Sequence, residues 1–324
     1  MSSRNRIAVS MALVLFLMAP VAATYAGDKP LSAVYTGQEN GGYVFSVGNS
    51  TYSGTLHPGD RYPVAFTIDL PGDATVRYQR YYLYWAWSRK DQQAVYPAIA
   101  ATGCPVPGGS AAPVVRYVDN KGFSSASDFY SGMDAFTCTN LTPGKNTVTF
   151  EIENTGEGNS TFVVQGAGVL AVYGSPSAPP GLIDVREGCD MLYSSYGITP
   201  EMATSRMDFD QEIDIPRLSK ATLELVAPSG GYTRSDVIRK NAVSVNREEN
   251  DKLPPFITSV LNLVFPEARG KEWVDVFDSD QQQQIGIETR DVTPYLAARS
   301  NFATVQDRGD YLLLTNAVFN VDYS

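Results

Sequence analysis

The chain has 324 residues, of which 43% are hydrophobic and 19% are charged, with a formal net charge of −10. This composition excludes a disordered chain, and the length suits two ordinary domains or one large all-β unit. The acidic charge argues against general electrostatic attraction to nucleic acid or to an anionic membrane surface.

The N-terminus has the pattern of a secretory signal. Two arginines precede an apolar stretch at residues 7–18, and a proline and small residues follow. The stretch is short for a transmembrane helix, although an uncleaved membrane anchor is the alternative. We assign residues 1–26 to the signal peptide, with cleavage after Ala26 or Ala23, so that the mature protein is secreted and extracellular or at the cell surface. Loss of the two arginines changes the net charge from −10 to −12.

Strand signals dominate the mature chain. Runs of β-branched and aromatic residues are bounded by glycine, proline, asparagine or aspartate. In chain order, the predicted strands are residues 42–46, 62–70, 76–88, 113–118, 146–152, 161–173, 212–215, 220–226, 242–245 and 311–323. Short helices are predicted only around residues 200–206 and 256–265. The sequence therefore predicts an all-β fold with few short helices.

One aromatic strand, at residues 76–88, has two distinct faces. Alternation places on one face Tyr81, Leu83, Trp85 and Trp87, and on the other Tyr78, Tyr82 and Tyr84. We expect the first face to fill a β-sandwich core. The second is a tyrosine stripe, for which packing between domains is favoured over a sugar-binding platform.

A faint internal repeat indicates two related β-sandwich halves, jelly-roll-like in type. The segment Ile68-Asp-Leu-Pro recurs as Ile213-Asp-Ile-Pro, an offset of about 150 residues, and each segment leads into a predicted strand. Residues 174–181 are rich in proline and glycine and form the best connector. We predict a first domain at residues 27–175 and a second at 176–324, or one continuous unit.

The three cysteines fit a secreted chain. Cys104 and Cys138 lie in loop-like contexts and are the favoured disulfide pair, although sequence alone leaves the other pairings open. Cys189 is then either an intermolecular disulfide partner or a buried free thiol. Asn49, Asn140 and Asn159 begin N-x-S/T sequons and are candidate glycosylation sites on an exposed surface.

Residues with potential chemistry are few. A weak candidate calcium site is formed by Asp275, Asp278 and Asp280, although their spacing is not that of an EF-hand. Calcium is the one candidate cofactor. His57 is the only histidine and lies in a turn sequence, so a multi-histidine metal site is excluded. No catalytic motif occurs, so we predict that the chain is not an enzyme. A hydrolase built on a carboxylate pair is the alternative.

Several segments resemble a known family. They are residues 69–76, the Thr102-Gly-Cys-Pro stretch, residues 172–180 and Glu187-Gly-Cys-Asp-Met-Leu. Together they are similar to an uncharacterised family of secreted, β-rich proteins, found mainly in methanogenic archaea, whose members look like surface-layer or sheath components. The resemblance covers roughly residues 28–323. It implies that residues 187–189 join the two halves within one unit.

These observations predict a structural, self-assembling extracellular protein of a surface layer or sheath. Its partners would be other copies of itself, and other cell-envelope proteins or glycans, but not nucleic acid. Unpaired strand edges can join between subunits, and an intermolecular bridge through Cys189 would strengthen such a lattice. The alternative is a secreted adhesin or carbohydrate-binding β-sandwich.

Overall fold

The computed structural model describes residues 27–106, 109–121, 130–195, 197–231, 240–247, 270–309 and 311–324. The N-terminal strands are β1 (Ser32–Ser46), β2 (Thr55–Leu56), β3 (Arg61–Leu70), β4 (Thr75–Lys90), β5 (Gln93–Ala94), β6 (Ile99–Val106), β7 (Gly109–Ala111), β8 (Val115–Asp119), β9 (Tyr130–Phe136), β10 (Gly144–Asn154) and β11 (Ser160–Gly174). The C-terminal elements are β12 (Pro180–Leu192), β13 (Thr204–Phe209), η1 (Ile215–Arg217), β14 (Leu218–Pro228), β15 (Asn241–Val245), β16 (Lys271–Val274), β17 (Ile285–Asp291), η3 (Thr293–Tyr295), β18 (Asn301–Asp307) and β19 (Leu312–Tyr323). The all-β prediction is confirmed.

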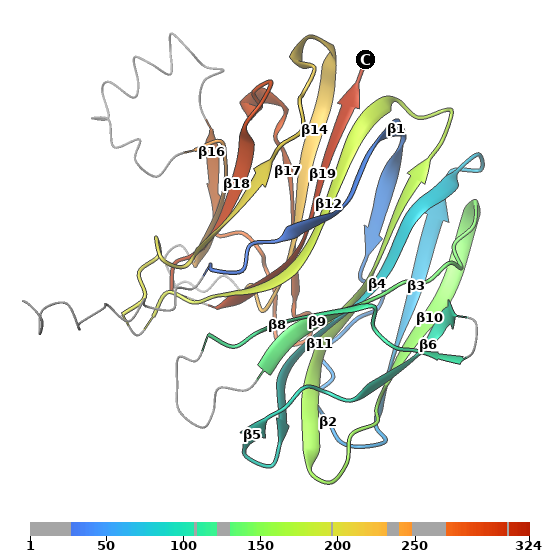
Figure 1. The fold of residues 1–324 in the computed structure, drawn as a ribbon, viewed down its shortest axis with the longest axis vertical. Helices are drawn as coiled ribbons and strands as arrows, with labels where there is room; N and C mark the ends of the chain where they lie inside the picture. The colour runs from blue at the N-terminus through green and yellow to red at the C-terminus, as the bar shows by residue number, and fades with distance from the viewer. Residues whose placement is uncertain are drawn as a thin grey trace, which may run out of the picture.

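The strands form one large sheet and two small ones. The large sheet follows the order β17-β14-β19-β12-β1-β11-β4-β9-β8, with β2 and β5 attached to β11 and β4. The small sheets have the orders β3-β10-β6-β7 and β13-β18-β15-β16. Each small sheet packs on one half of the large sheet, so the molecule is two β-sandwiches that share a continuous sheet (Figure 1).

The two sandwiches repeat the same strand plan. Outward from the central pair, β1-β11-β4-β9 on one side matches β12-β19-β14-β17 on the other, and the orders of the small sheets match as well. Chain order also agrees, because β1, β3, β4, β6, β7, β9, β10 and β11 correspond in turn to β12 through β19. The predicted pair of related β-sandwich halves is therefore present.

The central pair of strands ties the halves together. β1 pairs with β11 of its own half along Gly41–Ser46 and with β12 of the other half along Ser32–Asn40. The connector between β11 and β12 is only residues 175–179, and β12 runs through the middle of the large sheet. Hydrogen bonds between β1 and β12 cross the predicted domain boundary along a whole strand, so the two halves share one sheet. The division into two domains at residue 175 stays a prediction.

Regular alternation builds the two sandwich cores. In β3 every second residue is buried, from Tyr62 to Leu70, and the residues between them are exposed. These side chains meet Tyr81, Leu83 and Trp85 of β4 in the N-terminal core. The ring of Tyr81 packs tilted on that of Phe150 with a centroid distance of 5.2 Å, which suits aromatic contact.

A third core lies between the halves, on the back face of the large sheet. It joins Tyr82 and Tyr84 of β4 to Ile183 of β12, Val226 of β14 and Val318 of β19. The hydroxyl of Tyr84 also donates a hydrogen bond of 2.8 Å to Asn316 of β19. The back faces of the two sandwiches thus pack against each other, which is the covering predicted for the tyrosine stripe.

Two local predictions were wrong, and one central strand was not predicted. Residues 200–203 form a turn rather than a helix, and β13 follows at once because burial of Met207 and Phe209 on the core favours a strand. The strand expected at residues 212–215 is irregular and ends in η1. β12 was not predicted beyond the connector. The predicted signal peptide and the helix at 256–265 lie outside the described residues.

Candidate functional site

The back-face core contains a buried carboxylate surrounded by tyrosines. Glu187 of β12 accepts hydrogen bonds from Tyr82 at 2.8 Å and Tyr78 at 2.9 Å on Oε1, and from Tyr117 of β8 at 3.1 Å on Oε2. Arg80 Nε lies 3.5 Å from the same carboxylate. A buried charge needs such partners, because an unpaired one would cost several kcal/mol, on the order of its lost hydration.

Burial changes the acidity of these tyrosines. Desolvation, followed by repulsion from Glu187, raises the pKa of Tyr78, Tyr82 and Tyr117 above the usual value of 10.0. Desolvation also raises the pKa of Tyr84. The phenols therefore stay protonated and can act only as hydrogen-bond donors toward Glu187. This network, which comprises Glu187 and its three tyrosines, is called the Glu187 network below.

The alternative of a sugar-binding platform at Tyr78, Tyr82 and Tyr84 is thereby wrong, and the favoured packing between the halves is present. Tyr82 and Tyr84 are fully buried, and Tyr78 is half-buried with its hydroxyl turned to Glu187. No face of this stripe is free for a sugar ring, because the second sandwich covers it.

A second polar cluster lies where the N-terminal segment meets β8 and β12. Lys121 Nζ lies 2.7 Å from Asp119 and 2.9 Å from Asp190, and it also pairs with Asp28. Burial of Lys121 lowers its pKa, but these carboxylates outweigh that effect and raise it above the usual value. Lys29 adds a contact of 3.2 Å to Asp119.

These three aspartates are the one group of three potential metal ligands found among the described residues, with ligand atoms within 4.8 Å of one another. The ammonium group of Lys121 already contacts all three carboxylates. The protein thus supplies its own cation, and the cluster is a structural ion network that joins the segment around Asp28 to both halves.

The predicted calcium ligands do not converge. Asp278 pairs with the buried Lys240 at 2.7 Å, while Asp275 accepts the backbone N–H of the same lysine. Asp280 instead accepts the backbone N–H groups of the glutamine tract that follows it, at 2.7 and 2.6 Å. Asp275 and Asp278 thus bind two different groups of Lys240, whereas Asp280 binds the backbone of its own loop. The three carboxylates do not form the predicted calcium site.

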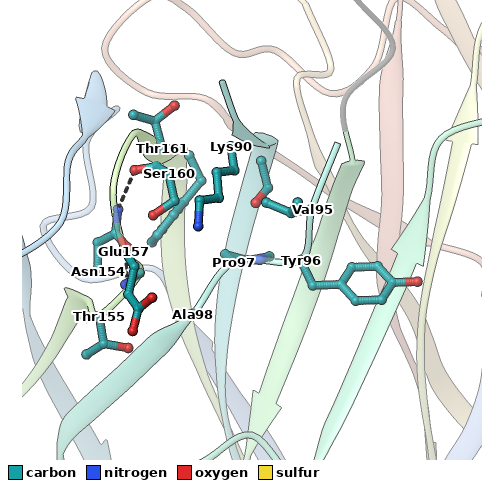
Figure 2. Close-up of a pocket in the computed structure, with 13 residues that line it drawn as sticks. Lys90, Val95, Tyr96, Pro97, Ala98, Asn154, Thr155, Glu157, Ser160 and Thr161 are labelled. Atoms are coloured by element: carbon teal, nitrogen blue, oxygen red, sulfur yellow. Dashed lines mark hydrogen bonds between the residues drawn. The ribbon is translucent and has the colours of Figure 1, made fainter. Parts of the chain in front are cut away.

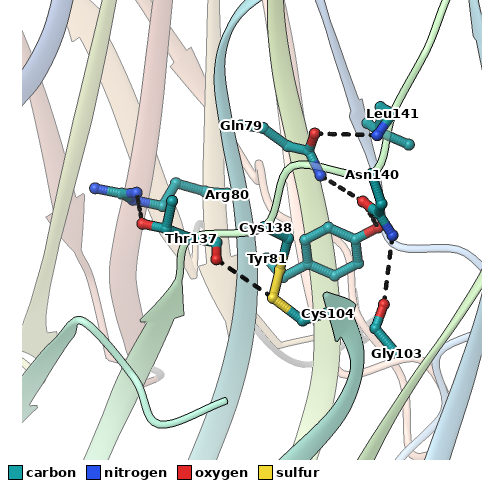
Figure 3. The surroundings of a disulfide bond; sticks show 9 residues. All are labelled: Gln79, Arg80, Tyr81, Gly103, Cys104, Thr137, Cys138, Asn140 and Leu141. Carbon is teal, nitrogen blue, oxygen red and sulfur yellow. Dashed lines mark hydrogen bonds between the residues drawn. A yellow bond between two sulfur atoms is a disulfide. The ribbon is translucent and has the colours of Figure 1, made fainter. Parts of the chain in front are cut away.

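The cysteines divide as one disulfide and one thiol. Cys104 of β6 and Cys138 after β9 are bonded, with their Cα atoms 5.1 Å apart, which is the favoured pair (Figure 3). Cys189 is a buried free thiol in β12, packed on Met191 and Leu313. Burial raises its pKa. The alternative of an intermolecular bridge through Cys189 is therefore wrong, because the sulfur does not reach the surface.

The three sequon asparagines differ in accessibility. Asn49 and Asn159 are exposed. Asn140 instead lies beside the disulfide, where its Oδ1 accepts from Gln79 at 2.7 Å and from Tyr81 at 3.0 Å (Figure 3). Its Nδ2, the atom that would carry a glycan, points to the carbonyl of Gly103. Asn159 Nδ2 also has a partner, Asp91 Oδ1 at 2.8 Å, but both Asn49 and Asn159 are exposed and remain candidate glycosylation sites. Asn140 is half-buried and takes part in an internal hydrogen-bond network at both ends of its amide.

The described surface includes two open clefts beside β4. The first has a volume of about 350 Å³ between β4 and the β10–β11 turn, and Figure 2 shows Lys90 and Glu157 at its wall with the ring of Tyr96 pointing away. The second, of about 480 Å³, lies between the two halves beside Trp87.

His57 is exposed at a turn and donates its backbone N–H to Asp60 at 2.8 Å.

Comparison with known proteins places the chain in a family. A family model described as "Protein of unknown function (DUF3344)" matches residues 24–322. The chain belongs to this family. No curated protein matches it. The crystal structure of the major capsid protein P2 from Bacteriophage PM2 aligns with 87% of this chain and 98% of its own, at 10% identity and a TM-score of 0.20. This overlap is too weak to carry a functional argument. No helix among the described residues has the length and apolarity needed to cross a membrane.

Proposed function

We propose that the protein is a self-assembling structural component of an extracellular surface layer or sheath. The observation that carries this proposal is that exposed apolar side chains lie on the edge strands of the sheets. Seven large hydrophobic residues are exposed in the described chain, and four of them lie on or beside edge strands: Val114 and Val115 at β8, Val274 on β16 and Ile287 on β17. Edge strands that carry exposed apolar residues are sites where chains join.

The two main edges stand at opposite ends of the large sheet. Among the described strands, β17 pairs only with β14 and β8 only with β9. Ile287 and Val115 are each 38% exposed. If β17 of one copy adds to β8 of the next, the sheet continues from molecule to molecule. Such a head-to-tail contact does not require closure and produces open filaments or layers.

A rigid subunit suits this role. The shared sheet, the Glu187 network and the Cys104–Cys138 disulfide all limit movement between and within the halves. The predicted signal peptide and the disulfide support an extracellular location. Copies with a net charge of −12 repel one another, so we expect salt or calcium to promote assembly.

The test is electron microscopy and sedimentation of purified residues 27–324, with and without salt and calcium. We expect ordered filaments, sheets or tubes. Val115→Lys and Ile287→Lys should each abolish them, because a charge on an edge strand prevents pairing. Ile215→Lys is the matched control, since Ile215 is also 38% exposed but lies in η1. A monomer under every condition, or assembly that ignores both edge variants, would refute the proposal.

A further inference from the structure

Trp87 departs from the alternation of its own strand. The pattern of β4 predicts it in the sandwich core with Trp85, yet Trp85 is fully buried and Trp87 is 62% exposed. Pairing between β4 and β9 shifts register between Trp85 and Ser88, and Trp87 has a φ of +55°. A β-bulge therefore turns this side chain outward.

The position of Trp87 lowers the stability of the fold. A bulky residue in the left-handed region costs about 1–3 kcal/mol, and most of the indole remains in water. Bulges that redirect a side chain occur often beside binding and active sites. The exposed, strained Trp87 thus indicates that the cleft next to it has a binding role.

The cleft beside Trp87 is formed by both halves. Its volume is about 480 Å³. The lining residues are Tyr52, Ala86, Trp87, Val163 and Gln165 from the N-terminal half, and Ser229, Gln281, Gln284 and Tyr311 from the C-terminal half. None of these nine residues is charged, although the chain as a whole has a net charge of −10. The cleft therefore offers aromatic rings, amides and a hydroxyl group.

Hydrogen bonds of the backbone and of one side chain hold the walls of the cleft in place. The backbone N–H of Tyr52 donates to the carbonyl of Gln282 at 2.8 Å, and that of Ser229 donates to the carbonyl of Gln284 at 2.8 Å. Gln165 is buried, with its Nε2 donating to Ser229 Oγ. Its Oε1 has no hydrogen-bond partner. This oxygen is enclosed by the protein, so Gln165 shapes the cleft wall through its bond to Ser229 and does not contact a ligand.

These features select one class of ligand. A charged ligand would find no opposite charge in the cleft, and a purely apolar one would displace water from the amide groups of Gln281 and Gln284 without replacing its hydrogen bonds. A sugar satisfies both conditions, because its ring has an apolar face and its edge carries hydroxyl groups. We propose that this cleft binds a neutral carbohydrate, whose ring stacks on Trp87 and whose hydroxyl groups bind the amides of Gln281 and Gln284.

The proposal is independent of assembly through the sheet edges, since the cleft lies between the halves and not on β8 or β17. The proposed site differs from the alternative sugar-binding platform at Tyr78, Tyr82 and Tyr84, because the second half covers those rings. The residue that the sequence assigned to the core is instead the one exposed for stacking.

The test is calorimetric titration of folded residues 27–324 with maltohexaose, cellohexaose, mannohexaose, xylohexaose and chitohexaose, and with oligogalacturonate as an acidic control. We expect at least one neutral oligosaccharide to bind and the acidic one not to bind. Trp87→Asn should weaken binding at least tenfold, and asparagine tolerates the positive φ, so the fold is retained. Trp87→Tyr should retain part of the affinity, and Gln281→Ala should weaken binding severalfold.

Tyr96→Asn is the matched control, because Tyr96 is 58% exposed and lies at the other cleft. It should bind as the parent does. Failure of every neutral oligosaccharide to bind, or equal binding by Trp87→Asn and the parent, would overturn the proposal. Loss of self-association in Trp87→Asn without any sugar binding would also overturn it and identify Trp87 as a subunit contact.

Discussion

The Glu187 network makes a quantitative prediction for Tyr82→Phe. This change removes only a hydroxyl group that donates to Glu187 Oε1 at 2.8 Å, and both residues are buried. A hydrogen bond to a charged group contributes about 1.5–3 kcal/mol. Glu187 keeps Tyr78, Tyr117 and Arg80. We therefore expect the free energy of unfolding to fall by about 2 kcal/mol.

The assay is urea unfolding at pH 7 with the disulfide intact. The midpoint should fall while the dependence on urea stays the same, because the surface exposed on unfolding is unchanged. Tyr96→Phe is the control, as Tyr96 is exposed, and its effect should stay within about 0.5 kcal/mol.

A double-mutant cycle then tests the partner. In a Glu187→Gln background the acceptor is neutral, so Tyr82→Phe should cost only about 1 kcal/mol. A Tyr82→Phe variant as stable as the parent, or a cost that is the same in both backgrounds, would show that the contact with the Glu187 carboxylate does not stabilise the fold as argued.

The remaining predictions concern pH, the disulfide, the thiol and glycosylation. The pKa of Tyr82 is raised in the folded state, so the unfolded chain loses its proton first, and stability should decline above pH 10 when followed by thermal unfolding; the Tyr82→Phe variant should decline less steeply, by about 1.4 kcal/mol per pH unit. Replacing Cys104 and Cys138 by serine opens a loop with a separation of 34 residues, and chemical unfolding should show a loss of about 4 kcal/mol. Cys189 should resist iodoacetamide at pH 8 until the chain is unfolded, and rapid labelling of the folded protein would contradict its burial. In a glycosylating host, mass spectrometry of peptides should find Asn140 unmodified, whatever the state of the other sequons, because it is half-buried and both ends of its amide bind neighbours beside the disulfide.

Much of the fold follows from local patterns. The alternation of β3 and the aromatic run of β4 are readable because side chains in a strand point to opposite faces with a period of two. The same rule separated Tyr81 from Tyr82, and the structure places them in two different cores. The sequence favours the pairing of Cys104 with Cys138 because both lie in loop-like contexts of a chain that is predicted to be secreted.

Other features depend on partners that are distant in the chain. Lys121 meets Asp28 and Asp190, which are 93 and 69 residues away, and no local pattern marks such a cluster. Cys189 is buried because β12 runs through the middle of the large sheet, a position set by pairing with β1 and β19. The aspartates at residues 275–280 looked like ion ligands only because sequence spacing does not show the turns between them.

The sequence by itself determined that the chain is built of strands, that it contains two related halves, and which faces of those strands are apolar. These properties depend on composition and on alternation within one strand. The tertiary structure alone decided that the tyrosine stripe surrounds Glu187 and that Trp87 faces solvent. Both depend on strand register, and a bulge of one residue reverses the direction of a side chain without leaving a mark in the alternation that precedes it.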